Sequence, residues 1–455
     1  MKLRFSVWMV LVAGPAAAQD MPGMAMPPAA PVTPAAAAPA TSPPVARDAM
    51  AGMDMSGGDM AGMDMGGHAM VAGLGPYPMT REASGTSWQP DTSTHEGVHL
   101  TAGRWQFMLH ATLNGVYDNQ EGPRGSSKGF ASGMVMGIAK RAFDNGDVLQ
   151  LRGMLSPDPL MGPSGYPLLL ATGETADGKT ALVDRQHPHD LFMELSASYS
   201  HKLSDRDSVF IYAGLPGEPA FGPPAFMHRL SIMDSPEAPI SHHWLDSTHI
   251  TFGVVTAGFV HGNLKLEASR YHGREPDQHR YDIEVGALDS TAVRLSWNPT
   301  RTLSLQGSWT RQISPEQLNP HDNETKWSAS AIYTAPVGAH GYWATTAAFG
   351  RRLSEGATLD AYVLESAVKF DARWTVFARA ESVANAELLA PAGGHGAAYT
   401  VGKASVGAIR DFPLAAHVKF GIGGLYARNF VPAGLDAAYG GNRGGAMGFV
   451  RLKID

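Results

Sequence analysis

Residues 105–117 have the sequence WQFMLHATLNGVY, in which apolar and polar side chains largely alternate. Trp105, Phe107 and Leu109 fall on one face of an extended strand, whereas Gln106 and His110 fall on the other. The same period of two returns over residues 302–309 and 373–382. Such strands, about ten residues long, are typical of transmembrane barrels, although a two-faced soluble sheet has the same alternation.

The links between these segments distinguish the two classes. Long links alternate with short turns along the chain, and bacterial barrels combine long extracellular loops with short periplasmic turns in this way. Residues 103–455 therefore predict an all-β fold, a transmembrane antiparallel β-barrel of about 16 strands (14–18), with long inserted loops at 156–189 and 215–247. Strands are expected near residues 103–118, 129–141, 147–155, 190–202, 208–214, 248–260, 263–272, 290–298, 302–311, 325–335, 340–351, 359–370, 373–384, 398–411, 415–428 and 444–454.

The first eighteen residues have the features of a secretory signal peptide. Lys2 and Arg4 provide the positive charge, residues 5–13 the apolar core, and residues 16–18 the small side chains of a cleavage site. The apolar core is too short for a membrane-spanning helix, which needs about 20 residues. Together with the barrel pattern, this predicts the outer membrane of a Gram-negative bacterium as the location.

Residues 19–100 are predicted to form a disordered arm on the periplasmic side, since this low-complexity segment is poor in bulky apolar residues. Half of the 22 methionines of the chain lie between residues 21 and 79, and part of the segment repeats every ten residues. Thioether sulfur is a soft ligand that selects Cu(I). The candidate ligands in the arm are Met53, Met55, Met63, Met65 and His68. The alternative is a linker in which methionine is incidental.

Histidines form a second concentration, with ten of 18 falling between residues 187 and 279. Both long loops are rich in Pro, Gly, Leu and Phe, so we expect them to fold into the lumen and bring their histidines together. Imidazoles beside carboxylates suit Cu(II) or another divalent ion. The candidate ligands here are His187, His189, His228, His242 and His243. The alternative is that these histidines only form hydrogen bonds in a polar lumen.

Several classes of function are disfavoured by the sequence. The chain has no cysteine, which excludes disulfides, thiolate metal sites and cysteine nucleophiles. A net charge of −7 without a dense basic patch gives no sign of a nucleic-acid partner. No Gly-x-Ser-x-Gly elbow, His-Glu-x-x-His motif or phosphate-binding loop is present, so we predict that the protein is not an enzyme.

The Met-rich segment at residues 50–70, placed ahead of a barrel, resembles the copper-resistance outer-membrane proteins of Gram-negative bacteria, the CopB/PcoB type. Residues 185–190 and 239–244 instead look like those of a separate group of barrel proteins often associated with metal-resistance genes. The resemblance implies copper handling at the outer membrane, with membrane lipids and periplasmic copper proteins as partners. The sequence thus predicts a porin-like barrel that binds copper and sequesters or passes it, contributing to metal resistance. The alternative is a general porin or small-solute channel with no metal role.

Overall fold

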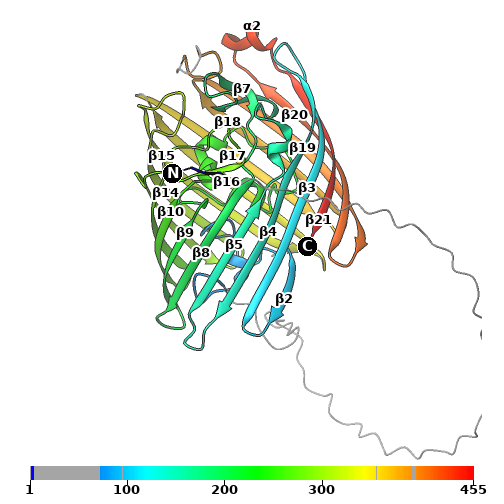
Figure 1. Cartoon of the computed structure of the whole chain (residues 1–455). Helices are drawn as coiled ribbons and strands as arrows, with labels where there is room; N and C mark the ends of the chain where they lie inside the picture. Colours follow the sequence, from blue (N-terminus) through cyan, green and yellow to red (C-terminus); the bar gives the residue numbers. More distant parts are fainter. Residues whose placement is uncertain (1, 5–71, 95, 355, 391–395) are drawn as a thin grey trace, which may run out of the picture. The chain divides into compact units, whose positions relative to one another are not determined.

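The structure, a computed structural model, describes residues 2–4, 72–94, 96–354, 356–390 and 396–455. Within them, sixteen antiparallel strands close into a barrel, in which the last strand pairs with the first (Figure 1). The barrel strands are β3 (Trp105–Gln120), β4 (Ser127–Ala142), β5 (Val148–Leu155), β8 (Phe192–Lys202), β9 (Asp207–Gly214), β10 (Val254–His261), β11 (Leu264–Tyr271), β13 (Ser290–Thr300), β14 (Leu303–Ile313), β15 (Asn323–Val337), β16 (Gly341–Ser354), β17 (Ala357–Lys369), β18 (Trp374–Asn385), β19 (Tyr399–Ala415), β20 (Val418–Phe430) and β21 (Gly444–Ile454).

The two faces of the wall differ in polarity. Leu109, Tyr117 and Trp327 are 44%, 60% and 52% exposed on the outside, whereas Lys265 and Glu267 are buried on the inside and lie 3.0 Å apart. An apolar outer face with aromatic side chains and a polar interior is the arrangement of a transmembrane β-barrel. The predicted fold class is therefore confirmed.

Links of different length lie at the two ends of the barrel. Turns of two to five residues join β4 to β5, β10 to β11 and β19 to β20 at what we call the short-turn end. The opposite, long-loop end carries residues 156–191 between β5 and β8, and residues 215–253 between β9 and β10. The chain enters β3 and leaves β21 at the short-turn end, as expected for an even number of strands.

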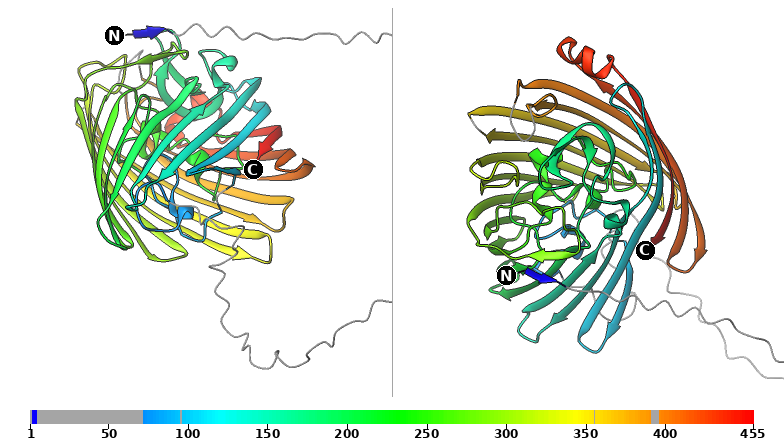
Figure 2. Two further views of the ribbon diagram at one scale, coloured as in Figure 1. Left: turned by 60° about the horizontal axis from the view of Figure 1, so that its bottom comes forward. Right: turned by 45° about the horizontal axis from the view of Figure 1, so that its top comes forward.

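Both long loops fold into the lumen, as the sequence predicts. We call residues 156–191 the first inward loop and residues 215–253 the second inward loop. The first contains η2 (Asp158–Met161) and the hairpin of β6 (Tyr166–Thr175) and β7 (Ala181–Gln186); the second contains η3 (Phe226–His228), α1 (His242–Leu245) and η4 (Ser247–His249). Figure 2 shows their green ribbons inside the ring of strands. Their apolar side chains, Leu168 and Trp244 among them, are buried together with residues of the wall.

The strand expected at residues 248–260 is wrong in its first part. Residues 247–249 form η4 instead, and β10 begins at Val254. In a regular strand, Ile250 and Phe252 would face lipid and His249 would face the lumen. Ile250 and Phe252 are instead 5% and 1% exposed. The reason is that this segment still belongs to the second inward loop and buries both of its faces in the lumen.

Residues 72–94 differ from the prediction of a disordered arm that continues to residue 100. They contain η1 (Met79–Arg81) and lie inside the barrel, where Leu74 and Trp88 are each 3% exposed. We call residues 72–94 the plug. Residues 98–102 form β2 (Val98–Ala102), which pairs with β3. The remainder of the predicted arm, residues 19–71, lies outside the described residues.

Four further short elements complete the described chain. η5 (Ala433–Leu435) and α2 (Asp436–Tyr439) lie in the link before β21. β1 (Lys2–Arg4) pairs with β12 (Asp282–Glu284), while the other residues of the predicted signal peptide lie outside the described part. No helix in the described ranges is long and apolar enough to span a membrane.

Candidate functional site: a histidine chamber in the lumen

Five histidines of the two inward loops meet in the lumen. We call His187, His189, His242, His243 and His249 the histidine chamber; all five are at most 9% exposed. The ring centres of His189 and His249 lie 5.1 Å apart, and those of His242 and His249 lie 5.2 Å apart. His187 joins them at 6.1 Å from His242 and 5.7 Å from His243. The inward folding of the loops thus brings together motifs that are more than fifty residues apart in sequence.

Three of these rings are oriented by an acceptor at Nδ1. His189 donates to Oδ2 of Asp158 over 2.8 Å, and His242 donates to Oδ1 of Asp246 over 2.8 Å. His249 donates to the backbone carbonyl of Asp246 over 2.7 Å. Such second partners orient the imidazoles of metal sites and leave Nε2 available to the ion.

Several Nε2 atoms of the chamber have no hydrogen-bond partner in the described structure. These are the Nε2 atoms of His189, His243 and His249. A buried polar atom without a partner costs about 1–3 kcal/mol. A ligand that accepts electron density from these nitrogens would therefore be favoured at this place.

The position of His243 depends on a glycine. Gly173 has φ +115°, and a Cβ added there would lie 2.3 Å from Nε2 of His243. His243 also faces Glu275, with Nδ1 3.5 Å from Oε1, and His187 lies 3.1 Å from Glu174. Each of these two rings is therefore paired with a carboxylate at the edge of the chamber.

Burial controls the charge of the chamber. It lowers the pKa of His242, although the hydrogen bond with Asp246 acts in the opposite direction. Burial also lowers the pKa values of His187 and His249 well below the usual value, helped at His187 by Arg280 and at His249 by His189. Burial alone would lower the pKa of His243, but Glu275 outweighs it and the pKa is raised. Neutral imidazole, the form that binds metals, is thus favoured at three of the positions.

Asp246 is itself held by a buried arginine. Arg229 donates from Nη1 to Asp246 over 2.7 Å and from Nη2 and Nε to Glu365 on β17 over 2.7 and 2.8 Å. Burial would raise the pKa of Asp246, but Arg229 and His242 lower it. Because bidentate guanidinium–carboxylate pairs are geometrically specific, this contact fixes the second inward loop to the wall.

As the side chains stand, no group of three or more His, Asp or Glu residues in the described ranges is arranged to hold a metal ion. Two imidazoles that bind one ion through nitrogens at about 2.0–2.1 Å have ring centres about 5 Å apart. The two closest ring separations in the chamber have this length. Coordination would therefore require the rings to turn rather than the loops to move.

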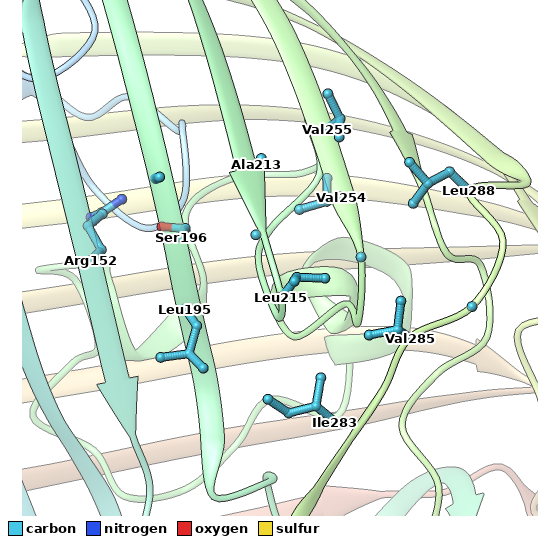
Figure 3. A pocket seen from close by; sticks show the side chains of 14 residues that line it. Arg152, Leu195, Ser196, Ala213, Leu215, Val254, Val255, Ile283, Val285 and Leu288 are labelled. Carbon is cyan, nitrogen blue, oxygen red and sulfur yellow. The ribbon is translucent and has the colours of Figure 1, made fainter. Parts of the chain in front are cut away.

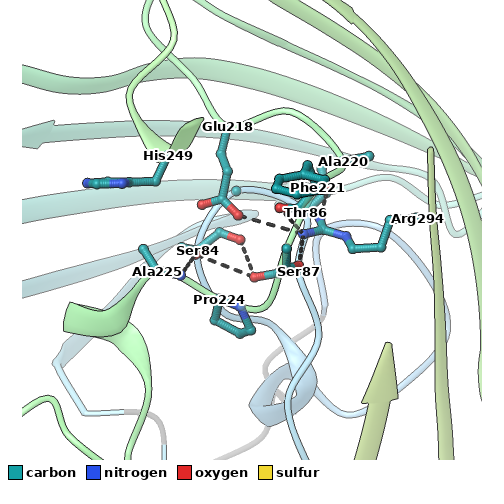
Figure 4. A network of polar contacts seen from close by, with 12 residues as sticks. Ser84, Thr86, Ser87, Glu218, Ala220, Phe221, Pro224, Ala225, His249 and Arg294 are labelled. Carbon is teal, nitrogen blue, oxygen red and sulfur yellow. Dashed lines mark hydrogen bonds and ion pairs between the residues drawn. The ribbon is translucent and has the colours of Figure 1, made fainter. Parts of the chain in front are cut away.

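The plug contacts the second inward loop, the loop that also carries His249 of the chamber. The backbone N–H of Ala225 donates to Oγ of Ser84 over 2.9 Å, and Arg294 of β13 donates to Thr86 over 2.9 Å (Figure 4). Glu218 lies 3.8 Å from Arg294 in the same network. Burial raises the pKa of Glu218 to about 7, although Arg294 opposes this. The lumen is thus filled from both ends.

A second group of contacts holds the plug to the wall. Glu82 accepts from Lys140 of β4 over 2.6 Å, and Arg152 of β5 donates to the carbonyls of Gly85 and Ala83 over 2.5 and 2.8 Å. Nζ of Lys265 also donates to the carbonyl of Thr86. The plug has no core of its own: it is stabilised by charged groups of the lumen and by the packing of Leu74 and Trp88 against Phe210 and Val260 of the wall.

A cavity of about 870 Å³ lies away from the chamber at the wall. It is lined mainly by apolar side chains of β8, β9, β10, the second inward loop and the link after β11, such as Leu195, Leu215 and Val255 (Figure 3). These three are 39%, 50% and 38% exposed on the lipid-facing side. This hollow offers few polar groups for chemistry.

No protein-family model matches the chain, and no curated protein is similar to it in sequence. Among solved structures, it is similar to OmpF of Salmonella typhi in complex with daunomycin, with 10% identity, a TM-score of 0.49 and coverage of 78% of this chain and 100% of that chain. It is also similar to OprB of Pseudomonas putida, with 9% identity, a TM-score of 0.46 and coverage of 76% of this chain and 94% of that chain. An anion-selective porin from Comamonas acidovorans is similar with 10% identity, a TM-score of 0.44 and coverage of 77% of this chain and 100% of that chain. The assignment as a β-barrel rests on the strand pairing described above.

The predicted ligands divide into three groups. The structure brings together His187, His189, His242 and His243. His228 lies apart from their rings and, together with Glu82 and His110, lines a cavity next to the plug. Met53, Met55, Met63, Met65 and His68 lie outside the described residues, so their predicted role stays a prediction.

Three residues at the chamber, His249, Asp158 and Asp246, were not predicted as site residues. His249 is visible in the sequence only as one more histidine near the end of the second loop, although it lies closest to His189 and His242. Asp158 is 31 residues before His189, and no sequence pattern connects them. The contact between Asp246 and His242 could have been predicted from the sequence, since the two residues are four apart, the spacing of one helical turn.

Proposed function

We propose that this outer-membrane-type β-barrel binds copper in its histidine chamber and sequesters the ion or passes it through the plugged lumen. The observation that carries the proposal is the cluster of five buried imidazoles, in which Nε2 of His189, His243 and His249 lacks a partner. The closed barrel with its apolar outer face supports an outer-membrane location.

The chemistry of the chamber favours a borderline transition metal. Imidazole suits Cu(II), zinc and nickel, and Cu(II) binds such sites most tightly among the common divalent ions. The Nδ1 acceptors Asp158 and Asp246 make Nε2 the unprotonated nitrogen of His189 and His242, so that only the orientation of the rings has to change when an ion arrives. The neutral charge state of His242 and His249 at pH 7 leaves no proton to displace.

The methionine-rich arm would serve the same function at an earlier step. Its thioethers select Cu(I), the form in which the periplasm would supply copper, and periplasmic copper proteins would be the donors or acceptors. We propose no catalytic role for the barrel; the chamber histidines act in this proposal only as ligands.

The test is a Cu(II) titration of the full-length protein in detergent, with a competing chelator of known affinity. The double variant His242→Ala/His249→Ala should lose one equivalent of tightly bound Cu(II). His201→Ala is the matched control, because His201 also pairs with an aspartate, Asp147, at 2.9 Å but is 53% exposed at its side chain on the wall. Identical binding curves for the double variant and the control would refute the role of the chamber.

The alternative is a general channel for small solutes. A 16-stranded barrel usually leaves an aqueous pore, but here the plug and two loops fill it. Single-channel recording distinguishes the two functions. A wide conductance that copper leaves unchanged supports the porin, whereas a small or copper-sensitive conductance supports metal handling.

A further inference from the structure

The methionines of the barrel are all on the inside. Residues 103–455 contain nine, and none of them is more than half exposed to lipid or solvent: seven are at most 7% exposed and two are partly buried. In a transmembrane barrel, apolar side chains belong on the outer face and polar ones in the lumen. The nine are Met108, Met134, Met136, Met154, Met161, Met193, Met227, Met233 and Met447.

Several of them form a row across neighbouring strands. Met136 of β4 pairs in register with His110 of β3 on one side and with Met154 of β5 on the other. Directly opposed residues of antiparallel strands have Cβ atoms about 4.5–5.5 Å apart, so their side chains meet. Met108, Met134 and Met193 belong to the same buried cluster. We call these five methionines, together with His110, the methionine row.

Two small cavities lie along the row, each of about 60 Å³. We call the one next to the plug the lower cavity; it is lined by Met108, His110, Met136 and Met233, among others. The upper one is lined by Met134, Met227 and Met233 and reaches His187 and His189 of the histidine chamber. Each is large enough for an ion and a few water molecules, and Met233 contributes to both walls.

His110 provides an independent sign of a ligand. It is 4% exposed, and its Nδ1 has no hydrogen-bond partner among the described residues. It is thus a buried soft-to-borderline donor that faces the lower cavity beside Met136. The acids of this cavity, Glu82 and Glu96, are already paired with Lys140 and Lys453. Arg152, also in the lining, donates to the carbonyls of Gly85 and Ala83. The other side-chain donors of the lining include the uncharged thioethers, the imidazoles of His110 and His228, and the amide of Gln89.

From this arrangement we infer that the methionine row binds a soft monovalent cation, Cu(I), and forms the passage between the plug and the histidine chamber. The inference rests on the proposed copper function and names the oxidation state and the route. Met108, Met136 and His110, which all line the lower cavity, supply two thioether sulfurs and one imidazole nitrogen, the ligand types that select Cu(I) and Ag(I) over hard ions. Met134, Met227 and Met233 continue the same chemistry toward His189.

The competing explanation is that methionine only fills irregular gaps between the wall and the plug. Leucine distinguishes the two, because it has a similar volume and cannot bind a metal. The matched control is Met447→Leu. Met447 is 3% exposed on the inner face of β21, but it packs in the other large cluster and lines neither small cavity.

The experiment uses the full-length protein with ¹³C-labelled methionine methyl groups in detergent micelles, titrated with Ag(I) as a redox-stable substitute for Cu(I). The methyl signals of Met108 and Met136, assigned from the variants Met108→Leu and Met136→Leu, should shift and saturate. The double variant should bind one Ag(I) fewer than the wild type in native mass spectrometry, whereas Met447→Leu should bind the same number. The arm is present in all samples and cancels from the comparison.

The opposite result would be lumen signals that stay in place while those of other methionines shift, with equal Ag(I) stoichiometry in all variants. That outcome overturns the methionine row and leaves the chamber untouched, because the chamber is tested separately with Cu(II) at His242 and His249. In that case the chamber variants would lose Cu(II) binding, whereas the leucine variants of the methionine row would bind as much Ag(I) as the wild type. The thermal midpoint of each leucine variant reports whether the barrel is folded.

Discussion

At the scale of single residues, the orientation of the chamber depends on side chains that would not touch the ion. Asp158 accepts a hydrogen bond from Nδ1 of His189 over 2.8 Å and one from the backbone N–H of Gly133 over 3.2 Å. The histidine motifs themselves could be recognised in the sequence, because ten of 18 histidines fall between residues 187 and 279 and the pairs stand beside carboxylates. Asp158 could not, since its contact with His189 exists only after the first inward loop has folded back into the lumen.

Asp158→Asn keeps the shape of this side chain and removes its charge. We expect the affinity for Cu(II) to fall about 10–100-fold, the usual effect of losing an outer partner of a metal-binding histidine. A chelator-competition titration measures this change, and the thermal midpoint of the variant checks that the barrel is folded. Unchanged affinity in a folded variant would mean that His189 is not a ligand.

Glu218 gives the barrel a pH dependence. Burial raises its pKa to about 7, whereas in the unfolded chain it is near 4.5. The folded state then holds the proton more tightly, so the stabilisation is complete below about pH 4.5 and is lost as the pH rises through about 7. Each pH unit within this window is worth at most about 1.4 kcal/mol.

The thermal midpoint of the wild type should therefore fall between pH 5 and pH 8, and Glu218→Gln should remove this part of the fall. Asp144→Asn is the control, because the Asp144 side chain is 85% exposed. An equal slope for wild type and Glu218→Gln would show that Glu218 titrates normally in the fold.

At the scale of elements, the plug shows what composition cannot predict. Residues 72–94 are poor in bulky apolar side chains, and a segment of this kind does not fold alone. It is ordered here because the lumen supplies its partners, such as Lys140 for Glu82 and Arg152 for the carbonyls of Ala83 and Gly85. The inward folding of the two long loops, by contrast, could be predicted from their composition, since their apolar side chains need to be buried away from water.

The absence of cysteine from the chain makes the plug easy to test. Ser84→Cys places a single thiol at a position that is 4% exposed, and Leu160→Cys places one at a position that is 76% exposed. A membrane-impermeant maleimide should label Leu160→Cys in the folded protein and Ser84→Cys only after denaturation. Equal labelling rates in the folded state would mean that the plug leaves the lumen.

At the scale of the whole molecule, sequence was most informative about the wall. Every one of the sixteen expected strands has a counterpart, because each barrel strand alternates between lipid and a polar lumen, and that alternation is written in the residues themselves. The start of β10 was misplaced because His249 to Phe252 continue an alternating pattern inside the lumen. The contents of the lumen depend on long-range contacts, so only the tendency of the loops to fold inward could be predicted.

Copper binding by the histidine chamber can be seen directly by anomalous X-ray scattering at the copper absorption edge, from crystals of the full-length protein grown with Cu(II). We expect a copper peak in the lumen at about 2 Å from Nε2 of His189 and His249, the length of a metal–imidazole bond. Copper found only outside the lumen, or no peak at all in crystals that contain the ordered chamber, would contradict it.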